Sequence, residues 1–158
     1  MVLSNYQRLI KLAEETFAMH DDPSQLQVDQ AVRERLMQIH PATMSEFSDE
    51  NGPVAWLLLI PTTKELMEQF VNKDITEKEL FKLTPLNIKY ETIYLCSGLV
   101  LPEYQRKGII QGMALKAITE IRKEHPVQYL FNWAFTEGGD KAAERLSELT
   151  GLPLRKRS

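Results

Sequence analysis

Residues 99–113 constrain this chain more than any other stretch, because they join an apolar strand to a helix through a short basic turn. Residues 92–101 are rich in branched and aromatic side chains, which favours a buried strand. Pro102 follows this strand, and the turn is centred on Gly108. Apolar side chains then recur at helical spacing over residues 109–124. The sequence therefore predicts a strand–turn–helix unit with a loop at its mouth.

The turn of this unit is suited to an anion. The first N–H groups of a helix have no partner within the helix, and the helix dipole adds partial positive charge there. Gly108 lets an anion approach the backbone, and Arg106 and Lys107 add positive charge at the rim. In the alternative interpretation, the turn needs glycine for its dihedral angles and the basic residues for solubility. The loop alone leaves both interpretations open.

Length and charge limit the remaining possibilities. A chain of 158 residues is long enough for one core and too short for two ordinary domains, so we expect a single domain over 1–158. The formal net charge is −3, and the basic cluster at 155–157 is a terminal tail. We therefore expect no nucleic-acid partner.

The cysteine count and the apolar runs bear on the compartment. Cys96 is the only cysteine, which excludes an intrachain disulfide and a multi-cysteine zinc site. It is either an acyl-carrying nucleophile or, without a neighbouring base, a small buried apolar residue. The longest apolar run, 54–60, suits a buried strand rather than a membrane span, and residues 1–20 are amphipathic. We expect a cytoplasmic protein without a membrane partner.

The first third of the chain is predicted to supply two helices and a hairpin. Apolar residues recur at helical spacing over 4–20 and again over 24–39. Two strands, 44–47 and 54–60, flank the turn pair Asn51-Gly52 and are expected to pair antiparallel. These helices must cover a sheet.

The remaining segments complete a mixed sheet. Residues 61–63 open a helix, and a capping box begins a shorter one over 76–83. The strand at 127–135 follows a crossover helix, so it is expected beside 92–101 as a parallel or splayed partner. A last helix ends at Gly151. We predict an α/β (α+β) fold, with a mixed, largely antiparallel central sheet flanked by helices.

Histidine and tryptophan give no local site. His20, His40 and His125 are too scattered for a sequence-local metal site, and each lies at a helix C-terminus, where stabilising the dipole is sufficient. Trp56 and Trp133 are predicted in the core. No metal is expected.

Three patterns resemble one known family. Residues 105–110 match the pattern Gln/Arg-x-x-Gly-x-Gly/Ala at its first two defined positions, and residues 100–104 match Val-x-Pro-x-Tyr. The pattern Asn-x-x-Ala-x-x-Leu-Tyr, followed by Gly-Phe, falls on Asp140, Ala143, Leu146, Ser147, Gly151 and Leu152. With this order of elements, the chain resembles the GNAT superfamily of acyl-CoA-dependent N-acyltransferases. The resemblance implies a splayed parallel strand pair in the sheet.

The resemblance implies acetyl-CoA as co-substrate. The backbone N–H groups of the loop would hold its pyrophosphate, and the end of the strand would pair with the pantetheine arm as with an added strand. Asp140, at the family's asparagine position, would either bond the pantetheine or cap the last helix. The cofactor-binding residues implied are Leu99, Val100, Leu101, Gln105, Arg106, Lys107, Gly108, Ile109, Ile110 and Asp140.

Direct transfer of an acetyl group to a primary amine needs a deprotonated amine, a donor for the carbonyl oxygen and a route for the proton. The resemblance implies the backbone N–H of Val100 as that donor. Glu91 is the ordinary base on the central strand, unless it is only a surface residue. Ser147 replaces the family's acidic tyrosine, although a serine hydroxyl is a much weaker acid than a phenol. Tyr94 and Tyr104 are alternative acids or packing residues.

Other departures from the family pattern each allow two interpretations of the residue concerned. Ile110 stands where the family has Gly or Ala, so its side chain lies either beside the phosphates or in the core. Gly98 marks either the bulge at which the strands splay or a tight packing contact. Residues 152–157 can form at most one further strand, where the family usually has two.

Three functions follow. The first is an N-acyltransferase whose acceptor, a small-molecule or peptide amine, enters beside the N-terminal helices and the hairpin. The second is a non-catalytic CoA-binding or interaction domain of the same fold, and the third is a small α/β domain with a generic anion-binding turn. An open sheet edge also allows a homodimer. The acidic residues near the expected entrance are Asp21, Asp22, Glu46, Asp49 and Glu50.

Overall fold

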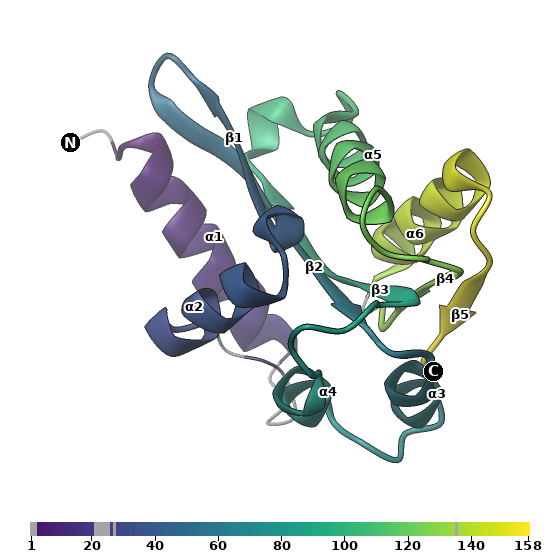
Figure 1. Cartoon of the computed structure of the whole chain (residues 1–158). Coiled ribbons are helices and arrows are strands. Elements are labelled where there is room, and N and C mark those ends of the chain that lie inside the picture. The colour runs from purple at the N-terminus through teal and green to yellow at the C-terminus, as the bar shows by residue number, and fades with distance from the viewer. Residues whose placement is uncertain (1–2, 21–25, 27, 135) are drawn as a thin grey trace.

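The computed structural model describes residues 3–20 (17–20 by their backbone only), 26, 28–134 and 136–158. It is built on a five-stranded sheet with helices on both faces (Figure 1). In chain order, the elements are α1 Asn5–His20, α2 Gln30–Ile39, η1 Pro41–Thr43, β1 Met44–Asp49, β2 Gly52–Thr62, α3 Lys64–Val71, α4 Glu77–Leu83, β3 Thr92–Val100, η2 Pro102–Tyr104, α5 Ile109–Arg122, β4 Tyr129–Asn132, α6 Glu137–Thr150 and β5 Leu154–Lys156.

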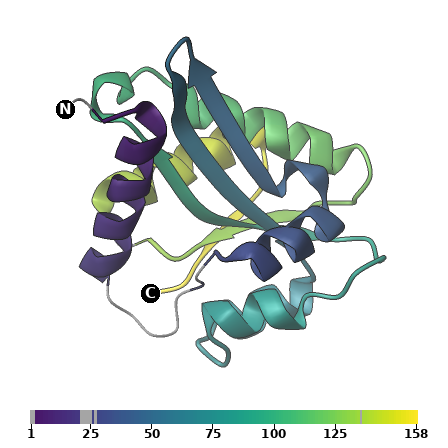
Figure 2. The same cartoon turned by 90° about the vertical axis from the view of Figure 1, so that its left-hand side faces the viewer.

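The strands follow one another across the sheet in the order β1-β2-β3-β4-β5. The β1–β2 and β2–β3 pairs are antiparallel, whereas β3–β4 and β4–β5 are parallel. The connections through α5 and α6 lie on one side of the sheet, and α1 and α2 lie on the other (Figure 1). The view turned by 90° shows α1 beside the β1–β2 hairpin (Figure 2). The predicted mixed α/β fold is confirmed, and β5 adds a second parallel pair.

Each face of the sheet carries its own core. Ile93 and Leu130 belong to the cluster under α5 and α6. The next residues along the two strands, Tyr94 and Phe131, belong to the cluster under α2, α3 and α4. All four side chains are at most 1 % exposed. This is the alternation expected of strands covered on both faces.

Strands β3 and β4 pair over only part of their length. The register runs from Thr92↔Tyr129 to Leu95↔Asn132, and β3 then continues to Val100. Beyond Leu95, the two strands therefore diverge and leave one edge of β3 open. The predicted splayed pair is observed, although β4 is shorter than the expected strand at 127–135.

The irregularity in β3 lies at Cys96. Leu59 pairs with Leu95 and Leu58 pairs with Ser97, so Cys96 is the extra residue. The bulge predicted at Gly98 is wrong, because the register fixes the inserted residue where β4 leaves the sheet. The alternative for Gly98 is confirmed: a Cβ there would lie 3.2 Å from Ile110 Cγ2.

Most helix boundaries follow local capping signals. The Thr76–Glu79 capping box is present at α4, and Gly151 ends α6 with a φ of 74°. Helix α2 begins only at Gln30, where Asp29 caps it. The start predicted at residue 24 lies outside the described residues, and Leu26 and Val28 are not helical. No described helix combines the length and hydropathy that crossing a membrane requires.

Candidate functional site

The open edge of β3 presents unpaired peptide groups. The Leu101 N–H donates to Val54 O at 2.9 Å, so Leu101 faces β2. Since successive residues of a strand turn their peptide groups to opposite edges, Val100 faces the edge that β4 has left. The Val100 carbonyl accepts a long bond of 3.5 Å from Gln105 Nε2, which agrees with this direction. An extended ligand could add here as a further strand.

The loop after this edge leads into the N-terminus of α5. Arg106 and Gly108 both adopt left-handed backbone conformations, with φ of 62° and 73°. Gly108 is the N-cap of α5 and makes no side-chain capping bond, so the first N–H groups of the helix have no side chain to satisfy them. A Cβ at Gly108 would meet nothing within 4 Å. The backbone is therefore open to an approaching anion.

Side chains around the loop leave this approach free. Arg106 and Lys107 are exposed, and Lys107 Nζ lies 5.5 Å from the centre of the Tyr104 ring. Ile110 packs against both the α5–α6 cluster and the cluster around Leu9. Its methyl group lies over Gly98, so the side chain of Ile110 points to the sheet and not to the mouth of the loop.

Two salt-bridge partners hold the start of the loop to α1. Arg8 donates to both carboxylate oxygens of Glu103, at 2.7 and 2.6 Å. This bidentate pair lowers the pKa of Glu103 to about 2. Residue 103 is thus fixed to a helix that is distant in the sequence.

The next residue of the loop is held by the hairpin. The Tyr104 hydroxyl donates to Asp49 Oδ2 at 2.5 Å, and Asp49 also accepts from Asn5 Nδ2 at 2.9 Å. The bond from Tyr104, followed by the one from the Asn51 N–H, lowers the pKa of Asp49. The same bond raises the pKa of Tyr104, which makes its phenol a weaker acid.

The structure does not bring the predicted base to the open edge. Glu91 precedes β3, and its Oε1 accepts a long bond of 3.4 Å from Lys64 N. At about 3.3 Å per residue, Glu91 and Val100 are roughly 30 Å apart. They lie at opposite ends of the same strand.

Ser147 is engaged in ending α6. Its hydroxyl donates to the Leu152 carbonyl at 2.6 Å, and its own carbonyl accepts from the Gly151 N–H. The N-terminus of α6, not this end, follows β4. Ser147 therefore lies away from the divergence of the strands, with its proton already donated.

A buried acid adjoins the bulge. Glu77 is 5 % exposed, and its carboxylate accepts from the Tyr94 hydroxyl at 2.5 Å and from the Leu26 N–H at 2.6 Å. Burial, then nearby Cys96 and Glu77, raises the pKa of Tyr94 well above its usual value. Burial, then Glu77, does the same to the pKa of Cys96, which keeps the thiol neutral. From the sequence, Glu77 is only a residue in the first turn of the helix predicted over 76–83, and nothing there indicates that it is buried.

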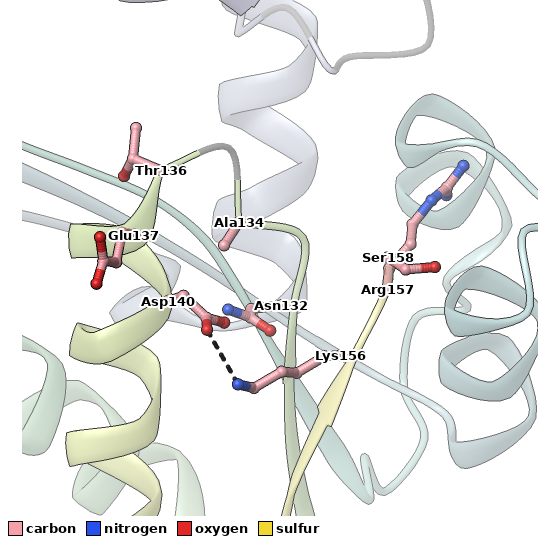
Figure 3. Close-up of a pocket in the computed structure, with 8 residues that line it drawn as sticks. All are labelled: Asn132, Ala134, Thr136, Glu137, Asp140, Lys156, Arg157 and Ser158. Atoms are coloured by element: carbon pink, nitrogen blue, oxygen red, sulfur yellow. Dashed lines mark hydrogen bonds and ion pairs between the residues drawn. The ribbon is translucent and has the colours of Figure 1, made fainter.

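A cavity of about 410 Å³ lies where β4 and β5 end, beside the first turn of α6 (Figure 3). Lys156 Nζ bonds Asp140 at 3.1 Å and Glu144 at 2.7 Å, and the Lys156 bond lowers the pKa of Asp140. Asp140 does not cap α6, because Thr136 does. Asn132 is 4 % exposed, and its Oδ1 has no hydrogen-bond partner among the described residues. No pattern in the sequence indicates a site at Asn132 or Lys156.

Two histidines that are distant in the sequence meet. The rings of His40 and His125 are 5.8 Å apart, and ligand atoms of both and of Glu124 lie within 4.8 Å of one another. The fold thus brings together two histidines that are too far apart in the sequence for a sequence-local site. Each Nδ1 accepts a backbone N–H, from Ala42 at 3.0 Å and from Tyr90 at 3.2 Å. The neutral rings therefore carry their proton on Nε2 and offer no lone pair to a metal. The side chain of His20 lies outside the described residues.

The acidic residues of the hairpin have different surroundings. Glu46 accepts from Trp56 Nε1 at 2.8 Å, and Glu50 is exposed. Trp56 and Trp133 are both half-buried at the margins of the clusters. Asp21 and Asp22 lie outside the described residues.

Comparison with known proteins adds no relative: no family model, curated protein or solved structure matches this chain. The site is therefore interpreted from its motifs and its geometry.

Proposed function

We propose that this protein is a GNAT-type N-acyltransferase that moves an acetyl group from acetyl-CoA directly to a primary amine. One observation carries the proposal: the open edge of β3 is followed, after η2 and a short turn, by helix α5, whose N-cap Gly108 makes no side-chain capping bond. An extended arm and a pyrophosphate, linked in one ligand, need these two features next to each other.

The chain's own groups have distinct roles in this proposal. Backbone N–H groups of residues 105–110 would bind the pyrophosphate, and Arg106 and Lys107 would add charge at the rim. The peptide groups of Val100 would pair with the pantetheine arm or donate to the thioester carbonyl. The acyl end would then reach toward Leu95, where β3 and β4 separate.

Acetyl-CoA would supply the activated acyl group, and the protein would hold the thioester and the amine in position for the transfer. A held amine and thioester gain much of their rate from orientation alone. Glu91 is too far from the open edge to take the amine proton, so we assign that step to water. We propose that the reaction takes place in the cytoplasm, a reducing compartment in which a single cysteine needs no disulfide partner.

The second candidate is a CoA-binding domain without turnover. Two observations favour it: the hydroxyls of Ser147 and Tyr104 both donate to other groups of the chain. Neither is ready to protonate a departing thiolate.

Calorimetric titration with acetyl-CoA tests the proposal. Gly108→Glu places a carboxylate at the loop, and Gly151→Glu is a matched control because Gly151 has almost the same φ, 74° against 73°, and equally open surroundings. We expect micromolar binding in the wild type and in Gly151→Glu, and its loss in Gly108→Glu. No binding by the wild type would refute both candidates.

A thiol-release assay then separates the two. Release of free CoA in the presence of a panel of primary amines supports the transferase. Binding without release for any amine supports the non-catalytic domain.

A further inference from the structure

The residues that fasten the loop form a closed network. Glu103 is held by Arg8 of α1, and Tyr104 is held by Asp49 of the hairpin. Asn5 of α1 bonds Asp49 at 2.9 Å and so joins the two attachments. We name these five residues the loop clamp. It connects three segments that are distant in the sequence just before the anion-binding turn.

The turn after the clamp is in a conformation that it does not favour by itself. Arg106 has a φ of 62°, in a region where a residue with a Cβ is disfavoured. Such conformations persist only where the surrounding structure determines them. Tyr104 is fixed two residues before Arg106, so the clamp sets the direction from which the chain enters the turn.

We propose that the loop clamp holds residues 105–110 in their ligand-binding conformation, so that Arg8, Asp49 and Tyr104 are positioning residues for the pyrophosphate of acetyl-CoA. The ligand in this inference rests on the function proposed above. Holding a loop in its bound conformation lowers the entropy lost on binding. The clamp also connects the loop to α1 and the hairpin, where the acceptor is expected to enter.

The exposure of these groups distinguishes positioning from general stabilisation. The Arg8 and Glu103 side chains are 33 % and 49 % exposed. Ion pairs in such positions contribute little to the stability of the whole fold. Disrupting the clamp should therefore change loop order and ligand affinity without a matching change in melting temperature.

The test uses two clamp variants with matched controls. Tyr104→Phe removes only the hydroxyl, and Tyr6→Phe makes the same change on α1, where the Tyr6 ring lies against Trp56. Arg8→Gln removes one positive charge, and Lys11→Gln does the same one turn further along α1. Titration with acetyl-CoA, amide hydrogen exchange of residues 106–110 and melting temperature are measured for each.

We expect acetyl-CoA to bind about fivefold more weakly to each clamp variant, the fold-change that about one hydrogen bond gives. Exchange of the loop amides should be faster, while melting temperatures stay within about 2 °C of the wild type. Exchanging the partners, Arg8→Glu with Glu103→Arg, should restore part of the affinity for acetyl-CoA and part of the protection of the loop amides.

Equal affinity and equal exchange in the clamp and control variants would overturn the inference. So would a melting temperature that falls in parallel with affinity. If the wild type binds no acetyl-CoA, the proposed function fails, while exchange of the loop amides still decides whether the clamp orders the turn.

Discussion

The two ends of β3 differ in burial and in strand pairing. From Thr92 to Tyr94 the strand is buried and has a partner on each side. Ser97 and Gly98 are exposed, and the edge facing away from β2 is open. The same strand is thus a core element at one end and a free surface at the other.

This difference suggests that stability and ligand binding are separated along one strand. The closed end carries large apolar side chains and the Glu77–Tyr94 pair. The open end offers backbone groups, which bind without needing any particular side chain. Substitutions should therefore lower the free energy of unfolding more at the closed end than at the open end, and the predictions below test this difference.

The largest effect is expected from Ile93→Ala at the closed end. Ile93 is 0 % exposed, and its truncation leaves a cavity that should lower the free energy of unfolding by about 2–5 kcal/mol. Ser97→Ala, in the exposed part of the same strand, should change it by less than about 0.5 kcal/mol. Urea denaturation measures both, and similar losses would contradict the comparison.

Tyr94→Phe should have the next largest effect. It removes the hydroxyl that donates to buried Glu77, which should cost about 1–3 kcal/mol of unfolding free energy. Tyr129→Phe on the neighbouring strand is the control and should be close to neutral. If the two variants unfold at the same denaturant concentration, the buried pair does not stabilise the closed end.

Acid should loosen the closed end. Burial, then His40 and Lys89, lowers the pKa of His125 below 6.5, and Glu124 opposes this shift. As the pH falls, His125 is therefore protonated in the unfolded chain before it is protonated in the folded protein. The contribution of His125 to stability is full above pH 6.5 and decreases as the pH falls through its lowered pKa.

His125→Gln tests this pH dependence, because a glutamine oxygen can still accept the Tyr90 N–H but does not titrate in this range. Urea midpoints between pH 7 and pH 5 should fall less in the variant than in the wild type. If the urea midpoints of the variant and the wild type fall equally, another group controls the loss of stability in acid.

The smallest effect is expected from Gly98→Ala at the open end. The new Cβ would lie 3.2 Å from Ile110 Cγ2, a contact that a small shift of the isoleucine relieves. We expect a loss of less than about 1 kcal/mol, restored in part by Ile110→Leu in the double variant, because leucine carries no methyl group on its Cβ. A larger loss in a denaturation experiment would show that the open end is as rigidly packed as the closed end.

Local signals explain why much of the fold was predictable. The Asn51-Gly52 turn fixed the hairpin, the Thr76 capping box fixed the start of α4, and Gly151 fixed the end of α6. The length of β4 was overestimated, because the strand ends where it leaves β3 and not where its apolar residues end. The start of α2 at Gln30 was missed because the apolar spacing begins earlier than the helix.

The candidate site was predictable only where its residues are contiguous. Residues 105–110 form one motif, so the loop and the N-terminus of α5 were expected. The partners of the clamp are 95 residues apart for Arg8 and Glu103 and 55 for Asp49 and Tyr104, and no spacing rule reaches that far. His40 and His125 meet for the same tertiary reason.

The bulge at Cys96 shifts the alternation of side chains between the two faces of β3 by one residue. Before it, the odd-numbered Ile93 and Leu95 pack under α5 and α6, whereas after it the even-numbered Gly98 faces Ile110 of α5. Because the strand has a period of two, the intact chain paired without this bulge would exchange the two faces of everything downstream. Ser97 would then lie opposite Leu57 and face Ile110 in place of Gly98. The phase of the open end, and with it the approach to the loop, depends on that one inserted residue.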